Sequence, residues 1–414
     1  MVSITEEVSR DEGNRRIIVQ KFGGTSVATA EGRNRVASKV AQAKKEGFWP
    51  VVVVSAMGRR PDPYATDTLL DMVRSAGVEV SAREQDLLIS CGEVISTVMV
   101  VQALKAAGHD AIALTGPQAG IVTDDHFGEA RIIGIGPERI LTALRQGQVP
   151  VVAGFQGCTI SGDVTTLGRG GSDTTASALA VALKAELVEI YTDVDGVMSA
   201  DPRVSGGAKI LESMTYEEIC ELANNGAKVV HPRAVEIVRQ AGIPMRVKNT
   251  FSDHPGTLIA SGKPSRVITG VTHMAGLARV EVDISRAKDQ GEARVQVFKV
   301  ISEEGINIDF INMTPTTTLF TVRADLADKA ELALERAGFS ARVARGCAKV
   351  SVIGAGMQYV PGIVARVVDA LYRRGIDIMQ TVDSEITISC LVREEDAQEA
   401  VRALFDEFGL SNAG

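Results

Sequence analysis

Short apolar runs alternate with longer amphipathic stretches along the first 260 residues of the chain. Runs of buried-strand length lie at residues 17–20, 51–54, 111–114, 150–153, 188–191 and 244–247. Stretches with helical spacing of apolar positions lie at residues 31–46, 82–107, 137–146, 173–183 and 215–223. Because strands and helices alternate, the pattern predicts an α/β fold in which helices cover both faces of a mainly parallel sheet.

After a segment at 261–266 with the glycine, proline and serine typical of a linker, the pattern changes and then repeats. Apolar positions between residues 297 and 308 recur 70 residues later, so that Gly305-Ile306 corresponds to Gly375-Ile376. Each copy is predicted to form a strand, a helix, two hairpin strands and a closing helix, which is a ferredoxin-like unit. The chain is therefore expected to continue into two such units.

Two glycine-rich segments each lie where a predicted strand gives way to a helix. The first, Lys-Phe-Gly-Gly-Thr-Ser at residues 21–26, follows strand 17–20. The second, at residues 165–177, joins three glycines to Arg169 and Asp173 before an apolar helix. Backbone N–H groups and the helix dipole favour anions at such turns, and neither segment has the spacing of a Walker A loop. Together they predict a phosphate- or carboxylate-binding site, although the second alone is also consistent with a helix cap.

Composition and charge exclude several other classes of protein. A net charge of −8, without basic runs that contain aromatic residues, argues against a nucleic-acid surface. The five cysteines lack metal-ligand and disulfide spacing, so no metal site is expected. No apolar run approaches the ~20 residues of a membrane span, and residues 1–16 lack a signal-peptide core. We therefore expect a cytoplasmic protein with no membrane or nucleic-acid partner.

Five motifs, in order along the chain, carry a resemblance to a known family. They lie at residues 21–27, 165–177, 191–197, 201–203 and 226–233. With them the chain resembles the monofunctional aspartokinases of the amino acid kinase superfamily. Residues 59–70, 83–93 and 307–315 are most similar to the diaminopimelate-sensitive subgroup. The resemblance implies an N-terminal extension at 1–16, an amino acid kinase catalytic domain at 17–260, a linker at 261–266, and ACT domains at 267–346 and 347–414, with the strand at 267–274 completing the second ACT domain.

The resemblance implies transfer of the γ-phosphoryl group of ATP, with Mg²⁺, to the side-chain carboxylate of L-aspartate. This is the first step of the pathway to lysine, threonine, methionine and diaminopimelate. A carboxylate is already ionised at neutral pH, so the site must align two anions and neutralise charge more than it must supply a base. Lys21 is expected to bridge the β- and γ-phosphates, and Asp173 to orient Lys21 and the hydrated Mg²⁺. Arg169 is expected to bind the α-carboxylate of aspartate, and Glu93, on a helix broken at Gly92, its α-ammonium.

Further binding residues are implied by the motif positions. The resemblance places ATP against Lys21, Phe22, Gly23, Gly24, Ser172, Thr192, Asp193, Asp201, Arg203, Lys228 and Val229. It places aspartate against Thr25, Ser26, Ser55, Thr66, Glu93, Arg169 and Gly170. Met198 stands where many aspartokinases have tyrosine, which leaves the packing of the adenine open, although a thioether can cover a purine face.

The ACT repeats imply regulation by an amino acid. An end product, which is diaminopimelate, lysine or threonine, is expected to bind between ACT copies near Asp289, Gln290, Gly291, Asn307, Ile308 and Asp309. The first copy is polar at 289–292, where the second has Pro361-Gly362, and this favours the more highly charged diaminopimelate. ACT modules pair, so a homo-oligomer is expected. Two alternatives remain open: a catalytically silent amino-acid sensor, and a kinase of the same superfamily with another substrate.

Overall fold

The computed structural model describes residues 16–75, 77–78, 80–227, 229–262, 266–357 and 360–411. The extension before residue 16, Lys228 and the centre of the linker at 263–265 lie outside the described residues. Contacts along the chain divide it into two compact units. The first holds residues 16–197, 210–220 and 229–262, and the second holds Met198–Lys209, residues 221–227 and the chain from residue 266 onward.

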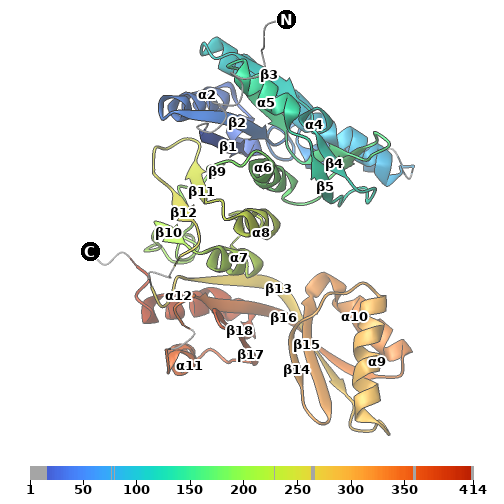
Figure 1. Ribbon diagram of the computed structural model, residues 1–414. Helices are drawn as coiled ribbons and strands as arrows, with labels where there is room; N and C mark the ends of the chain where they lie inside the picture. Colours follow the sequence, from blue (N-terminus) through green and yellow to red (C-terminus); the bar gives the residue numbers. More distant parts are fainter. Residues whose placement is uncertain are drawn as a thin grey trace, which may run out of the picture. The chain divides into compact units, whose positions relative to one another are not determined.

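An eight-stranded sheet forms the centre of the first unit, in the order β10-β12-β11-β9-β1-β2-β6-β3 (Figure 1). Its strands are β1 (Arg16–Phe22), β2 (Phe48–Val54), β3 (Ala111–Leu114), β6 (Val149–Ala153), β9 (Leu187–Thr192), β10 (Ser213–Met214), β11 (Met245–Asn249) and β12 (Thr257–Ile259). All neighbouring strands are parallel except β11 and β12. The central strands β2 and β6 are buried runs of valine, which is typical of a parallel sheet covered on both faces.

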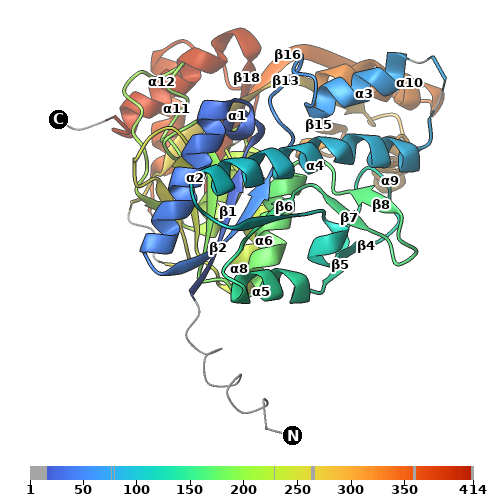
Figure 2. The same ribbon diagram turned by 90° about the horizontal axis from the view of Figure 1, so that it is seen from above.

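Helices cover both faces of this sheet. Those of the first unit are α1 (Gly24–Val27), α2 (Ala30–Lys45), α3 (Thr66–Ser75), α4 (Ala82–Ala106), α5 (Glu138–Arg145), α6 (Gly171–Ala182) and α8 (Pro232–Ala241), with a 3₁₀ turn at Pro117–Ala119. A further helix, α7 (Tyr216–Asn224), runs from the first unit into the second. On one face, α2 and α4 lie side by side (Figure 2) over a core that includes Phe22, Val52 and Val151. On the other face, α6 packs against β1 and β9, and α8 packs against α6, so the predicted α/β fold is confirmed.

A smaller four-stranded sheet lies next to α4 in the order β5-β4-β7-β8. Its strands are β4 (Ile121–Thr123), β5 (Ile132–Ile135), β7 (Gln156–Cys158) and β8 (Val164–Thr166). The sequence did not predict this sheet, because strands of three or four residues with mixed polarity show no clear period. It leads directly into the second glycine-rich segment.

Helix α4 differs from the sequence-based expectation in two ways. Among the described residues it is long and apolar enough, by length and composition, to cross a membrane, so the expectation that no run approaches that length was wrong. Its apolar character has another cause, since it packs against α2, β3, β6 and β8. The helix is also continuous through Gly92, where a side chain would come within 2.8 Å of the Tyr64 carbonyl and 2.9 Å of the Ala56 Cβ. Gly92 therefore permits close approach of the loop before α3 and does not break the helix.

A six-stranded antiparallel sheet forms the second unit, in the order β14-β15-β13-β16-β18-β17. Its strands are β13 (Gly270–Asp283), β14 (Asp309–Met313), β15 (Thr317–Arg323), β16 (Ser340–Ile353), β17 (Gln380–Asp383) and β18 (Thr387–Arg393). Its helices are α9 (Gln290–Glu303), α10 (Ala327–Arg336), α11 (Ile363–Arg373) and α12 (Ala397–Glu407), with 3₁₀ turns at Ala324–Leu326 and Glu394–Asp396. The 14-residue strands β13 and β16 pair with each other and run through both halves of the sheet.

The two copies of the repeat share one local device. Helices α9 and α11 are each followed by a glycine in the left-handed conformation, Gly305 with φ 68° and Gly375 with φ 69°. The next residues, Ile306 and Ile376, each donate a backbone hydrogen bond back into the helix and enter the core of their own half. A left-handed C-terminal residue favours glycine. The repeated Gly-Ile is therefore a helix stop followed by a core residue, and the predicted pair of ferredoxin-like units is confirmed.

Candidate active site

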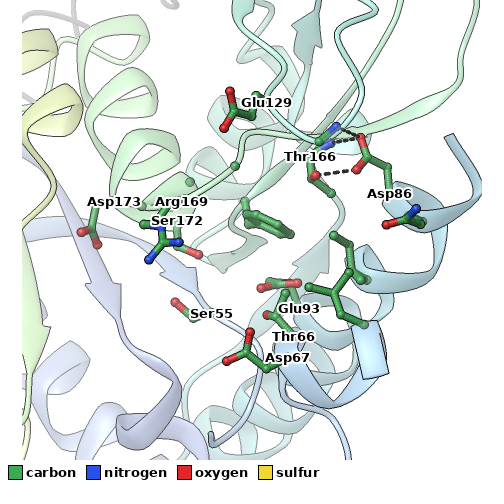
Figure 3. Close-up of a pocket in the computed structure, with 18 of the residues that line it drawn as sticks. Ser55, Thr66, Asp67, Asp86, Glu93, Glu129, Thr166, Arg169, Ser172 and Asp173 are labelled. Carbon is green, nitrogen blue, oxygen red and sulfur yellow. Dashed lines mark hydrogen bonds between the residues drawn. The ribbon is translucent and has the colours of Figure 1, made fainter. Parts of the chain in front are cut away.

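A cavity of about 640 Å³ opens in the first unit at the carboxyl ends of β1 and β2 and beside α4 (Figure 3). Several predicted site residues line it, namely Lys21, Ser55, Thr66, Glu93, Arg169, Gly170, Ser172 and Asp173. Figure 3 shows Arg169 and Asp173 on one side of the cavity, Glu93 and Thr66 on the other, and Ser55 between them. Ligands of α/β sheets collect at the carboxyl ends of the strands, which is where this cavity lies.

Lys21 and Asp173 form an ion pair at one side of the cavity. Lys21 is near the end of β1 and Asp173 is in the first turn of α6, and their Nζ and Oδ1 atoms are 2.6 Å apart. The side chains are only 13% and 12% exposed. The other carboxylate oxygen of Asp173 accepts the backbone N–H of His231 at 3.4 Å. The pair therefore holds the ammonium of Lys21 in a fixed direction at the positive end of a helix.

Glycines shape the backbone around this pair. Gly170 precedes α6 with φ 72°, and a side chain there would overlap the His231 ring. A Cβ on Gly24 would lie 2.6 Å from the Ala56 carbonyl oxygen and 2.7 Å from that of Gly58. The Gly23 N–H donates to the Tyr191 carbonyl at 3.2 Å. The turn after β1 is therefore pressed between the segment that follows β2 and the last residues of β9, which leaves no room for a side chain at Gly24.

Some residues of the first motif lie away from the cavity wall. Phe22 is in the core, with its ring stacked on Tyr191 at a centroid distance of 4.6 Å. Ser26 is fully buried and shares a hydrogen bond of 2.6 Å with the Thr250 hydroxyl. Side chains alternate along a strand, so Lys21 and Phe22 necessarily face opposite sides of the sheet. Contacts from Phe22, Thr25 and Ser26 to ligands stay predictions, because the cavity lining does not include them.

Glu93 is a buried carboxyl group on α4 that is only half partnered. Its Oε1 accepts the backbone N–H of Ala56 at 3.0 Å, whereas its Oε2 is buried without a hydrogen bond. Burial raises the pKa of Glu93 to about 8, because the charged form is poorly solvated there. A cation in the cavity would supply the missing partner and favour the charged form.

Asp86 also lines the cavity and was not predicted from the sequence. Its Oδ2 accepts the backbone N–H groups of Thr166 at 2.8 Å and of Gly128 at 2.9 Å, and its Oδ1 accepts the Thr166 hydroxyl at 2.7 Å. It thus ties α4 to β8 and to the loop before β5. Asp86 and Glu93 are seven residues apart, about two helical turns, so this spacing on one helix face could have revealed it. Asp67, Glu129 and Phe155 line the cavity too and were likewise missed.

Arg169 supplies a cation to the cavity. Glycines in the left-handed conformation flank it, Gly168 with φ 71° and Gly170 with φ 72°, and they set the direction of the segment. Within the described part of the chain, no hydrogen bond or ion pair engages its guanidinium, which faces the cavity (Figure 3). Such a group suits a carboxylate or a phosphate, either of which can pair with it through two hydrogen bonds.

The predicted nucleotide residues divide between the two units. Thr192 ends β9 and Asp193 follows it in the first unit, where Asp193 forms an ion pair of 3.1 Å with Arg59. Val229 also belongs to the first unit. Asp201 and Arg203 belong to the second unit and pair with each other at 2.7 Å. Met198 belongs to the second unit as well, and Lys228 lies outside the described residues.

The predicted effector residues flank the two ends of α9 in the second unit. Asp289 precedes the helix, and its Oδ1 accepts the N–H groups of Gly291 at 2.8 Å and Glu292 at 3.0 Å. Asn307, Ile308 and Asp309 follow the helix, and Asp309 pairs with Lys349 at 2.7 Å. Gln290 and Gly291 begin the helix, and its remaining twelve residues, about 18 Å, separate the two groups. One chain therefore does not bring both groups to the same end of α9.

Comparison with known families agrees with this geometry. Residues 16–249 match the amino acid kinase family, and residues 342–406 match the ACT domain family. The first match spans more than half of the chain and includes every residue of the cavity. Fold and site together define an amino acid kinase with a C-terminal ACT region.

Individual relatives make the family assignment more specific. The chain is 47% identical to aspartokinase 1 of Bacillus subtilis, over 96% of this chain and 100% of the relative, and 41% identical to the aspartokinase of Mycolicibacterium smegmatis, over 95% and 96%. A crystal structure of Escherichia coli aspartokinase III with aspartate and ADP has a TM-score of 0.79 at 25% identity and covers 95% of this chain and 100% of that one. The chain belongs to the aspartokinase family. It is an ATP-dependent kinase of aspartate with allosteric regulation through ACT domains, as the motifs implied.

Proposed function

We propose that aspartate binds in the cavity between Arg169 and Glu93. The guanidinium of Arg169, which no described residue engages, pairs with the α-carboxylate, and the Glu93 oxygen that lacks a hydrogen bond from that part of the chain accepts the α-ammonium. Ser55, between them, and Thr66, beside Glu93, supply hydroxyl contacts. This orientation leaves the side-chain carboxylate to approach Lys21 and Asp173. The proposal rests on one observation: the same cavity contains the guanidinium of Arg169, which no described residue engages, and the buried carboxyl group of Glu93, one oxygen of which has no hydrogen-bond partner among the described residues.

The chemistry then needs no proton transfer. One oxygen of the side-chain carboxylate forms a bond to the γ-phosphorus, while the bond from that phosphorus to the β,γ-bridging oxygen breaks. ADP leaves with the electron pair, and 4-phospho-L-aspartate remains. Lys21 stabilises the negative charge that develops on the phosphoryl oxygens, and Asp173 fixes its direction. The backbone at Gly24 and at Ser172, near the start of α6, supplies N–H groups for the phosphates, whereas the Gly23 N–H holds the turn against the Tyr191 carbonyl.

Mg²⁺ fits this site as a metal that arrives with ATP. Among the described residues, no group of three or more histidine, cysteine, aspartate or glutamate side chains could hold a metal. Mg²⁺ at kinase sites is held mainly by phosphate oxygens and water, with one or two carboxylates. Asp173 is the carboxylate placed for that contact, and the bound ion would neutralise charge on the triphosphate.

Substrate analogues test the orientation of aspartate. The assay couples ADP formation to a readout and traps the acyl phosphate as its hydroxamate. β-Alanine lacks the α-carboxylate and succinate lacks the α-ammonium. Wild-type enzyme should prefer aspartate strongly over both. Arg169→Ala should lose the preference over β-alanine and keep that over succinate, and Glu93→Gln should do the reverse. Equal losses against both analogues in either variant would overturn the assigned orientation.

We propose diaminopimelate as the effector and a homo-oligomer as the active form. The predicted effector groups flank opposite ends of α9, so a site that uses both is completed by another copy of the chain. The edge strand β14 exposes Ile311 and Met313, and an exposed apolar edge favours pairing with a second chain. The polar start of α9, at 289–292, suits a ligand with several charged groups better than threonine.

The effector proposal has a direct test. Activity is measured with millimolar diaminopimelate, lysine or threonine added separately, and mass in solution is measured by light scattering. We expect inhibition by diaminopimelate and loss of both oligomer and inhibition in Met313→Lys. Inhibition by lysine or threonine alone would contradict the subgroup, and a monomeric wild type would contradict the interface.

We also propose a cytoplasmic location. ATP and free amino acids are available there, and the apolar helix α4 is accounted for by its packing around the cavity.

A further inference from the structure

The segment that follows β2 is fixed against the glycine turn. The Gly58 N–H donates to the Gly24 carbonyl at 3.0 Å. Arg59 begins a tight turn, in which its N–H donates to Asp62 Oδ2 at 3.0 Å and its carbonyl accepts the Asp62 N–H at 2.7 Å. The backbone of Arg59 is therefore held next to the turn that follows β1.

The side chain of Arg59 crosses that turn. Its guanidinium meets the carboxylate of Asp193 at 3.1 Å, and Asp193 directly follows β9. In the sheet, β1 lies between β2 and β9. A side chain that starts after β2 and ends at the residue after β9 must pass over the carboxyl end of β1, where Gly23 and Gly24 lie. The guanidinium of Arg59 is thus a cation next to the Gly23–Gly24 turn, which is predicted to bind phosphate.

Replacing Asp193 as the partner of Arg59 would cost little free energy. The two side chains are 73% and 48% exposed, and ion pairs this exposed add little to stability because water screens them. The other cation at the turn, Lys21, is already engaged by Asp173 at 2.6 Å. A triphosphate that enters there brings more negative charge than Lys21 alone can balance, and an arginine pairs with phosphate through two strong hydrogen bonds.

We propose that Arg59 is a further nucleotide-binding residue, whose guanidinium exchanges the carboxylate of Asp193 for phosphate oxygens of ATP. The proposal rests on the assignment of the Gly23–Gly24 turn to ATP. It makes the segment after β2 part of the nucleotide site, and not only a neighbour of the aspartate site through Ser55.

Arg60 provides a matched control. It is the next residue, has the same charge, and forms an exposed ion pair of 2.8 Å with Asp71 on α3. Arg59→Ala should raise the KM for ATP about tenfold or more, because hydrogen bonds to charged groups contribute about 1.5–3 kcal/mol. It should leave the KM for aspartate within twofold. Arg59→Lys should recover part of the loss, and Arg60→Ala should match wild type in both constants. The same order is expected for ADP affinity measured by titration calorimetry.

The possible outcomes separate the two assignments. A KM for ATP within twofold of wild type in Arg59→Ala would overturn the role of Arg59. Equal losses in Arg59→Ala and Arg60→Ala would show a general effect of the loop and would overturn it as well. Lys21→Ala tests the ATP site itself and should lose roughly 10²–10³ in kcat. If Lys21→Ala keeps wild-type turnover, the site assignment fails, whatever Arg59 does.

Discussion

Helix α4 carries two buried carboxyl groups, Asp86 and Glu93, that differ in their hydrogen-bond partners. Asp86, near the start of α4, accepts three hydrogen bonds from Thr166 and Gly128. Glu93, two turns later, accepts one from Ala56 and keeps a buried oxygen without a partner. Both side chains are almost fully buried, at 1% and 2% exposure. Burial therefore does not distinguish the two carboxyl groups, whereas the missing partner does, and that difference is why we propose Glu93 and not Asp86 as the group that binds the substrate ammonium.

The largest expected effect is on the KM for aspartate, which should depend on Glu93 far more than on Asp86. Glu93→Gln keeps the bond from the Ala56 N–H but cannot carry the charge that pairs with an ammonium. We expect its KM for aspartate to rise about 100-fold, which is within the cost of losing one partner of a buried charge pair. The KM for ATP should stay within twofold. A normal KM for aspartate would show that Glu93 is not the ammonium partner.

The next effect is on stability. Asp86→Asn replaces the carboxylate with a neutral amide, whose oxygen is a weaker acceptor for the Thr166 and Gly128 N–H groups, and this should cost about 1–3 kcal/mol of unfolding free energy. Thermal unfolding would show this as a lower midpoint, while the KM for aspartate should change far less than in Glu93→Gln. If Asp86→Asn instead lost aspartate affinity at wild-type stability, Asp86 would belong with Glu93 as a binding group.

The contrast also predicts how stability depends on pH. The pKa of Glu93 is about 8 in the folded chain, against an ordinary value of 4.5. Between these values the folded protein holds a proton that the unfolded chain has released. The contribution of Glu93 to the free energy of unfolding therefore falls as pH rises, by up to about 1.4 kcal/mol per pH unit. The unfolding midpoint of Glu93→Gln should rise relative to wild type between pH 6 and pH 8, and a constant difference would contradict the raised pKa.

The smallest effect concerns substrate binding and pH. With a pKa of about 8, Glu93 is mostly protonated at pH 7 in the free enzyme and must lose that proton to pair with an ammonium. The KM for aspartate should therefore rise roughly fivefold from pH 8 to pH 7. Calorimetry in buffers of different ionisation enthalpy should detect proton release on binding at pH 7. Glu93→Gln should show neither effect.

Local sequence was sufficient for the parts of the site that depend on one strand–turn–helix junction. Lys21 and Asp173 each stand at such a junction, and the structure brings them together as an ion pair. Arg169 was found for the same reason, because glycines surround it in sequence. The repeated Gly-Ile could be recognised because each copy ends a helix in the same way.

Features that depend on strand order or on distant partners could not be found this way. The crossing from Arg59 to Asp193 exists only because β1 lies between β2 and β9, and no local pattern specifies that order. The spacing from Glu93 could have placed Asp86 on the same helix face, but no local pattern indicates that β8 supplies its partners. The resemblance placed Ser26 against the substrate, and no local pattern indicates that its hydroxyl also shares a hydrogen bond with Thr250, more than 200 residues away in the sequence.

The long strands β13 and β16 determine whether the two halves of the regulatory sheet can open independently. Each spans 14 residues and serves as a central strand for both halves of the six-stranded sheet. Deletion of either half would leave the remaining strands with an open, unpaired edge. Amide exchange in the two halves should therefore report a single opening event, since neither half has central strands of its own. The two halves meet where the pairing of β13 with β16 shifts register, at Met274–Arg279, and where Gly276 and Gly346 adopt the left-handed conformation, so a distortion in one half reaches the other through this irregular junction.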